Sequence, residues 1–312
     1  MRLLVTGASG FLGRNLLPSL PTDWEVTLTY RRDAGFCRFV EHCVRARSHT
    51  VQVDLSKADD VDRLASARPE YDACVYLAAN GDPAESVRRP AYDLEANTLA
   101  LVTLLERVRV GRLVYFSSGA VYDGIVGPVE PGVTARPSLP YAISKLASEH
   151  YVRSFHARGQ VGEAVIVRFF GAYGPYEPER KIYNRLVRQF AFEREPRFTI
   201  RGDGRNLIDA MYVDDAVRAM HVLLRGEPGV ISVDLASRAP MTLTELVQRA
   251  ARAFGLEPEI SYAGEVPEYI EFVSTDDRML DHYGFAPRVG LEDGLHRFAR
   301  WLAEDARQLA WA

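Results

Sequence analysis

Short apolar runs alternate with longer stretches of helical periodicity through the first half of the chain. Stretches near 11–20, 57–67, 91–109 and 140–157 favour helices. The runs between them are rich in β-branched and aromatic residues, as buried strands are, and cover 2–6, 25–30, 50–53, 73–78, 112–117 and 164–169. This alternation predicts an α/β fold in which helices cover both faces of a parallel sheet.

The pattern changes after Pro175. Beyond this residue the periodicity predicts amphipathic helices near 214–225, 242–254 and 290–303, and only two short strands, near 198–201 and 230–235. A chain of 312 residues can hold one large α/β domain and a smaller appended lobe. We therefore expect a first domain over residues 1–174 and a C-terminal α/β lobe over residues 175–312.

Three glycines lie between the first predicted strand and the helix after it. A tight strand-to-helix turn needs residues without a Cβ at the bend and where the backbone meets a pyrophosphate. The N-terminus of the helix then offers free N–H groups and the positive end of its dipole to that anion. A glycine turn without a ligand is the alternative. The position of the loop favours a Rossmann-type, doubly wound sheet whose cofactor meets Gly7, Gly10, Phe11, Leu12 and Gly13.

Arg31 and Arg32 follow the second predicted strand, where the residue that meets the adenosine ribose is expected. An acidic residue there favours NAD, whereas a guanidinium matches a 2′-phosphate. The arginine pair favours NADP(H) as the cofactor. Because the acidic Asp33 is close, two alternatives stay open: the cofactor is NAD(H), or the arginines are a basic loop start that binds no phosphate. Asp54 and Leu55 end the third strand and are candidates to meet the adenine edge, although Asp54 is equally typical of a plain strand end.

Tyr141 and Lys145 are four residues apart in a predicted helix, so their side chains project from the same side. An ammonium favours the phenolate, which allows tyrosine to act as acid or base nearer neutral pH. Such a spacing is common on solvated helix faces. Together with the glycine loop and an upstream Ser117-Ser118 pair, it predicts an acid/base site next to a nucleotide-binding loop.

These motifs resemble extended short-chain dehydrogenases/reductases of the NAD(P)-dependent nucleotide-sugar epimerase/dehydratase family. The resemblance covers essentially the full length. It is carried by the glycine loop Thr6–Gly13, Leu77-Ala-Ala79, Asn97, Phe116–Tyr122, Tyr141–Lys145, Arg168–Pro175 and Val213-Asp-Asp215.

The resemblance implies a role for each of these residues. The tyrosine is the acid/base, the lysine lowers its pKa and holds the nicotinamide ribose, and a serine hydrogen-bonds the reacting oxygen. Alignment on Val121-Tyr122 gives that last role to Ser118 rather than to Ser117. Four further positions, Leu77, Ala78, Ala79 and Asn97, belong to the implied cofactor site, although Asn97 is usually structural or organises water. The C-terminal lobe is implied to bind the substrate, with the chain crossing back to the sheet.

The implied chemistry is hydride transfer at a carbinol or ketone carbon. Dehydratases of the family carry an Asp-Glu pair directly after the serine, where this chain has Gly119 and Ala120, so sugar dehydration is not expected. Reduction of a 4-keto sugar with NADPH is favoured by Arg31 and Arg32. A 4-epimerase that keeps its cofactor bound is the alternative, and a non-catalytic NADP-binding sensor is a third.

The expected substrate pocket departs from the family pattern. Gly171 replaces an asparagine, Ile208 replaces an arginine, and residues 265–272 lack an expected basic residue. Either other cations carry a diphosphate, or the substrate is a smaller carbonyl compound or another phosphorylated sugar; the motif layout favours a nucleotide sugar. The candidate cations are Arg180, Lys181, Arg201 and Arg205. The candidate substrate contacts are Ser118, Gly119, Tyr141, Gly171 and Arg205.

Composition narrows the class of protein. The chain is 47% hydrophobic and 26% charged, as ordinary globular proteins are, and its net charge of −4 gives no footprint for nucleic acid or an anionic membrane. No apolar run approaches the roughly 20 residues that span a bilayer. Because polar and glycine residues interrupt the first strand at once, no signal peptide is expected, and we expect a cytoplasmic protein.

Two further expectations concern metal and assembly. Cys37, His42, Cys43 and His49 cluster in the sequence, but their spacing matches no common zinc site, and we expect no metal. Helices 91–109 and 140–157 correspond to the pair that family members commonly use in a dimer interface. A homodimer is therefore expected from the resemblance alone.

Overall fold

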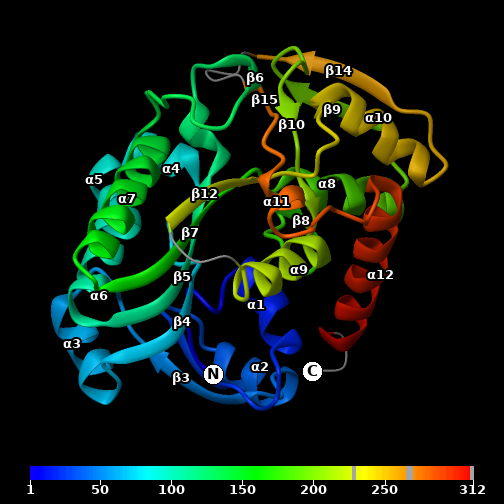
Figure 1. The fold of residues 1–312 in the computed structure, drawn as a ribbon. Coiled ribbons are helices and arrows are strands. Elements are labelled where there is room, and N and C mark those ends of the chain that lie inside the picture. The colour runs from blue at the N-terminus through cyan, green and yellow to red at the C-terminus, as the bar shows by residue number, and fades with distance from the viewer. Residues whose placement is uncertain (227–229, 265–269, 310–312) are drawn as a thin grey trace.

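The computed structural model describes residues 1–226, 230–264 and 270–309 (Figure 1). Seven parallel strands form the central sheet in the order β12-β7-β5-β4-β1-β2-β3. Their bounds are β1 Arg2–Thr6, β2 Glu25–Tyr30, β3 Arg47–Gln52, β4 Glu70–Tyr76, β5 Arg109–Ser118, β7 Val161–Phe169 and β12 Val230–Leu235. The chain winds outward in both directions from β1, so the predicted Rossmann-type fold is confirmed.

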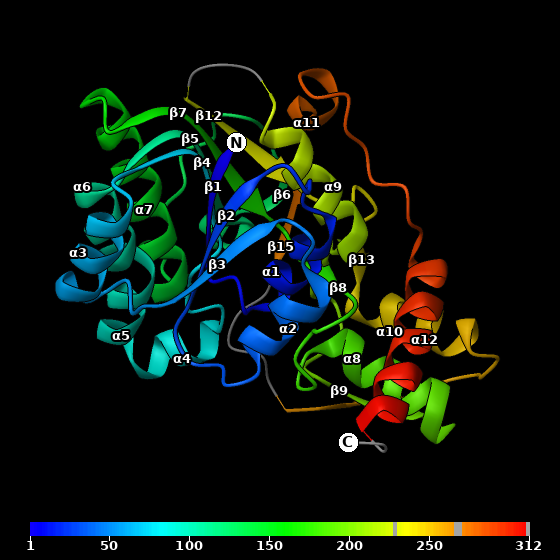
Figure 2. The same ribbon diagram turned by 90° about the horizontal axis from the view of Figure 1, so that it is seen from below.

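Helices cover both faces of the sheet (Figure 2). One layer holds α3 (Ala58–Ala67), α5 (Pro90–Leu94), α6 (Ala100–Arg107) and α7 (Pro140–Ala157). The other holds α1 (Phe11–Leu16), α2 (Phe36–Cys43) and α9 (Val213–Leu223). Strand β1 shows why two layers are needed: Leu4 faces one core cluster, whereas Leu3 and Val5 face the other, and all three are fully buried.

The predicted helix 91–109 is interrupted. Between α5 and α6 the backbone makes a π-helical turn over Glu95–Leu99, and α6 ends at Arg107 because β5 begins two residues later. Such π-helical turns frequently occur at functional sites. Here the turn contains Asn97, one of the residues expected near the cofactor.

The C-terminal lobe has a hydrophobic cluster of its own. It packs α8 (Ile182–Val187), α10 (Leu243–Ala253) and α12 (Leu291–Leu309) around Phe190, Phe198 and Phe298. Strand β9 (Arg197–Arg201) pairs in parallel with β14 (Glu259–Ala263) beside this cluster. The chain crosses back to the sheet at α9 and β12, as the resemblance implied.

A second pair of strands links the sheet domain to the late chain. Strand β6 (Val126–Val129) pairs in parallel with β15 (Glu271–Ser274), and the sequence did not predict either strand. Among the described residues, no helix is both long and apolar enough to cross a membrane.

Candidate active site

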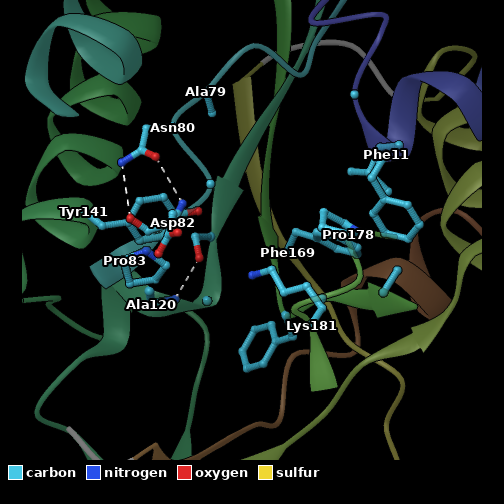
Figure 3. A pocket seen from close by; sticks show the side chains of 18 of the residues that line it. Phe11, Ala79, Asn80, Asp82, Pro83, Ala120, Tyr141, Phe169, Pro178 and Lys181 are labelled. Carbon is cyan, nitrogen blue, oxygen red and sulfur yellow. Dashed lines mark hydrogen bonds between the residues drawn. The ribbon is translucent and has the colours of Figure 1, made fainter. Parts of the chain in front are cut away.

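A cavity of about 690 Å³ opens where the carboxyl ends of β1, β4, β5 and β7 face the C-terminal lobe (Figure 3). The sheet side contributes Ser118, Tyr141 and the glycine loop, and the lobe contributes residues 177–181 and 207–209. Tyr141 and Ala120 lie on one side of the space, and Phe11, Pro178 and Lys181 lie on the other. In an open α/β sheet this is the crevice in which ligands bind.

A second cavity, of about 280 Å³, lies on the other side of the glycine loop. Its wall includes Arg31, Arg32, Asp54, Leu55 and Ala78. The two cavities share Gly7, Gly10, Leu77 and Ala79. An elongated ligand such as a dinucleotide can therefore run across the loop from one cavity into the other.

The glycine loop has the tight geometry that a dinucleotide requires. Gly7 has φ +64°, and a Cβ on it would lie 2.7 Å from the backbone nitrogen of Ala78. A Cβ on Gly13 would lie 2.3 Å from the carbonyl oxygen of Ala8. Only glycine fits either position, so the start of α1 packs closely on the sheet and leaves backbone exposed to a pyrophosphate. The residues present thus fit the cofactor that the loop predicts.

Tyr141 and Lys145 project from the first turns of α7, which begins with Pro140 at a position where proline needs no N–H partner. The Lys145 side chain is buried, and its Nζ donates a hydrogen bond of 2.9 Å to the carbonyl oxygen of Phe116. The Nζ lies 6.0 Å from the centre of the Tyr141 ring. The structure therefore brings the predicted Tyr141 and Ser118 to the lining of one cavity, and it buries Lys145 beside the Tyr141 ring.

Burial is the largest influence on the pKa values of both Tyr141 and Lys145. Burial raises the pKa of Tyr141, a hydrogen bond with Ser118 opposes this rise, and the negative charge of Asp93 adds to it. The effect of Lys145 on this pKa stays a prediction, because the causes that set the direction of the shift here are burial, Ser118 and Asp93. Burial also lowers the pKa of Lys145 to about 8, against the opposing charges of Asp93 and Glu149.

The two neighbouring serines have different surroundings. Ser118 lines the cavity, and its Oγ accepts a hydrogen bond of 3.1 Å from the backbone N–H of Ala120. Ser117 is buried beneath the site, and its Oγ donates a 2.7 Å hydrogen bond to Oε1 of Glu149. The geometry thus favours Ser118 as the serine that meets a ligand.

Asn97 does not line either cavity. It is 1% exposed, and its Oδ1 accepts a 2.8 Å hydrogen bond from the backbone N–H of Asn80. Its Nδ2 donates to Asp93 and Ser144. The prediction that Asn97 contacts the cofactor is therefore not supported by this structure, which gives it a structural position. Sequence reasoning did not identify Asn80 and Asp93 as members of this hydrogen-bond network. The one available signal was that Asp93 lies four residues before Asn97, on the same helix face.

The carboxylates near the second cavity are engaged elsewhere. Asp33 lies 2.6 Å from Nη2 of Arg14, and its other oxygen accepts from the backbone N–H of Gly35. Asp54 accepts from the backbone and side chain of Ser56. Arg31 donates a 2.9 Å hydrogen bond to Oη of Tyr92 and lines the cavity together with Arg32. The end of this cavity that is expected to hold the adenosine ribose is therefore lined by two arginines and one carboxylate, Asp54.

The substrate candidates separate into two groups. Gly171 and Ile208 line the first cavity, as do Arg180 and Lys181. Arg205 is exposed and not among the lining residues, so the structure does not bring this predicted contact to the site. Arg201 lines a different groove, and residues 265–269 lie outside the described part of the chain.

Two acidic residues at the first cavity were missed by sequence reasoning. Glu177 is 8% exposed, and burial raises its pKa to about 8. Its Oε2 accepts a 2.9 Å hydrogen bond from the backbone N–H of Asn184. Asp82 pairs with Arg180 at 3.0 Å, which joins the loop after β4 to the lobe across the cavity.

Gly119 and Ala120 line the same cavity as Ser118. A Cβ on Gly119 would lie 3.0 Å from the ring of Phe170, so a larger side chain at this position requires the ring to move. Neither residue carries a group that can transfer a proton.

Known proteins provide an independent comparison. Residues 3–233 match the model of the NAD dependent epimerase/dehydratase family. The dTDP-glucose 4,6-dehydratase of Streptomyces niveus is 27% identical over 98% of this chain and 94% of that enzyme. Among solved structures, UDP-glucose 4-epimerase of Thermotoga maritima has a TM-score of 0.87 at 22% identity, with 98% of this chain and 100% of that chain covered. MoeE5 in complex with UDP-glucuronic acid and NAD has a TM-score of 0.84 at 27% identity, with the same coverage.

Proposed function

Because this chain belongs to the NAD dependent epimerase/dehydratase family, we propose that it transfers a hydride between a nicotinamide cofactor and C4 of a nucleotide-activated sugar. The observation that carries this proposal is that Ser118 and Tyr141 line one cavity together with the glycine loop, while Lys145 lies buried beside Tyr141. The complex of MoeE5 with a nucleotide sugar and NAD supports the substrate class.

The side chains have separate tasks in the proposed reaction. A bound nicotinamide ring supplies or accepts the hydride at its C4. In the reducing direction Tyr141 gives its phenolic proton to the carbonyl oxygen as the carbonyl carbon gains the hydride, so that a C–H and an O–H bond form. Ser118 donates a hydrogen bond to the same oxygen, and the charge of Lys145 stabilises the phenolate that remains.

Sugar dehydration is not part of the proposal, although related sequences include dehydratases. Elimination of water needs an acid and a base next to the serine, and Gly119 and Ala120 provide neither.

The two arginines that line the second cavity favour net reduction with NADPH. The double variant Arg31→Ala/Arg32→Ala should weaken NADPH binding about 10- to 100-fold, because hydrogen bonds to a charged group contribute about 1.5–3 kcal/mol. NADH binding should change little. Calorimetric titration with both cofactors checks this, with the exposed Arg63→Ala as the matched arginine control. Equal loss for both cofactors, or a native preference for NADH, would contradict NADP(H) specificity.

A 4-epimerase is the second candidate, favoured by the likeness of the fold to the Thermotoga maritima enzyme. An epimerase returns the hydride to the same substrate and retains its cofactor. Denaturing the purified protein and identifying any released dinucleotide separates the candidates. Tightly held NAD favours the epimerase, and an empty site that prefers NADPH favours the reductase.

We also propose a homodimer through α5–α7. Leu99 and Tyr151 of this layer are 46% and 45% exposed, and two further large apolar residues there, Leu94 and Ile143, are also exposed. The variant Leu99→Arg/Tyr151→Arg should halve the mass measured by light scattering to that of one 34.9 kDa chain, because two charges would be buried in the interface. The variant Phe192→Arg, at an exposed site of the lobe, is the control. A native protein that is already monomeric would refute the dimer.

A further inference from the structure

Asp93 is a buried carboxylate behind the catalytic pair. It lies in α5 and is 1% exposed. Its Oδ1 accepts hydrogen bonds of 2.8 Å from Nδ2 of Asn80 and 2.9 Å from Nδ2 of Asn97. Its Oδ2 lies 2.6 Å from the hydroxyl of Ser144. These partners come from the loop after β4, the π-helical turn and α7, so one side chain joins three segments around the site.

All three hydrogen-bond partners of Asp93 are neutral. Burying a carboxylate is costly unless it is hydrogen-bonded and its charge is balanced. Its partner Ser144 directly precedes Lys145 in α7, so the carboxylate is anchored one residue from this buried ammonium. The same charge raises the pKa of Lys145 and of Tyr141. The arrangement therefore places a negative charge where it supports a buried ammonium.

The other ionisable groups around Lys145 are accounted for. Glu149 also raises the pKa of Lys145, but its carboxylate is bound by Arg168 at 2.8 and 3.0 Å. Tyr115 presents its ring 5.4 Å from the Lys145 Nζ, and Tyr141 presents its ring at 6.0 Å. Asp93 is thus the neighbouring carboxylate that no arginine or lysine binds directly within the described residues.

We propose that Asp93 is a positioning residue, whose charge keeps the buried Lys145 positively charged and whose hydrogen bonds hold α7 in place. The inference rests on the proposed function, because it concerns the residues assigned there to proton transfer. Asp93 does not line the cavity. It therefore acts through Lys145 and not on the substrate.

The substitution Asp93→Asn tests the charge with little change of shape. Oδ1 can still accept from Asn80 and Asn97. The new amide nitrogen can donate to the Ser144 hydroxyl, whose own proton then turns to the carbonyl oxygen of Tyr141, 2.9 Å away. The network stays fully hydrogen-bonded, so the variant should fold. A variant that fails to fold would count against the proposal, because the carboxylate would then be needed for structure itself.

The readout is the charge of Lys145, measured without turnover. The chain has three lysines, Lys57, Lys145 and Lys181, so carbon-13 labelling at lysine Cε gives few resonances, and Lys145→Arg identifies the relevant one. In the native protein this resonance should titrate near pH 8. In Asp93→Asn its midpoint should fall by about one pH unit or more, the size expected for removing a nearby opposite charge. An unchanged midpoint would overturn the proposal.

Ser144→Ala is the control, since it removes the shortest hydrogen bond to Asp93 but keeps the carboxylate. In Ser144→Ala the titration midpoint of the Lys145 resonance should stay near that of the native protein. The pH profile of kcat/KM gives a second readout: its alkaline limb should move to lower pH in Asp93→Asn and not in Ser144→Ala. An enzyme that is inactive on every nucleotide sugar would defeat the proposed function, yet the lysine titration would still decide the role of Asp93.

Discussion

Replacing Tyr141 by phenylalanine is expected to lower kcat by about 10²–10⁴-fold, the usual contribution of a positioned proton-transfer group. The change removes only the phenolic oxygen, and the ring keeps its packing beside Lys145. Cofactor affinity should therefore stay close to the native value. Turnover of a 4-keto nucleotide sugar and titration with NADPH measure the two quantities separately.

The control for this experiment is Tyr151→Phe. Tyr151 lies on the same helix but is 45% exposed and does not line the cavity, so its kcat should be native. If Tyr141→Phe kept its kcat within a few-fold of the native enzyme, another group would have to move the proton. The assignment of Tyr141 would then be wrong, whatever its position.

The second large effect concerns stability. Glu149 is 2% exposed, accepts from Ser117, and binds Nε and Nη2 of Arg168, whose side chain is only 11% exposed. Glu149→Ala would leave the Arg168 charge buried without its partner. Removing one member of a buried pair in this way costs about 3–5 kcal/mol of unfolding free energy. Urea denaturation, with the slope checked against the native protein, measures the loss.

An exposed pair of the same residue types provides the comparison. Arg249 and Glu292 lie 2.9 Å apart with side chains 43% and 48% exposed. Glu292→Ala should cost about 0–1 kcal/mol, because water screens the charges. Equal losses for the two variants would show that burial does not determine the strength of the Arg168–Glu149 pair.

Local sequence patterns predicted the inner strands of the sheet well because these strands are buried on both faces, unlike the edge strand β3. Runs such as Leu3–Val5 are apolar at every position, which is the pattern of a strand inside a parallel sheet. The glycine loop and the Tyr141–Lys145 spacing were also readable, because each depends on a few residues close together in the chain. The strand at 230–235 was predicted, but only the structure shows that it is the seventh strand of the central sheet.

The features that were missed depend on contacts between distant segments. Val126 pairs with Glu271 across more than a hundred residues, and the two short strands have no apolar run to reveal them. Asp93 meets Ser144 only because α5 packs on α7. Arg205 was a candidate to bind a phosphate from a position shifted from that of the missing arginine, yet its side chain is exposed to solvent.

The most direct test of the proposed reaction follows the hydride itself. The enzyme would be incubated with a 4-keto nucleotide sugar and NADPH that carries deuterium at the transferable position of its nicotinamide. We predict deuterium at C4 of the product and one NADP⁺ for each product molecule. In Tyr141→Phe we predict that both form at least about 100-fold more slowly. A product without deuterium at C4, or a native enzyme that only eliminates water from a nucleotide sugar, would contradict the account.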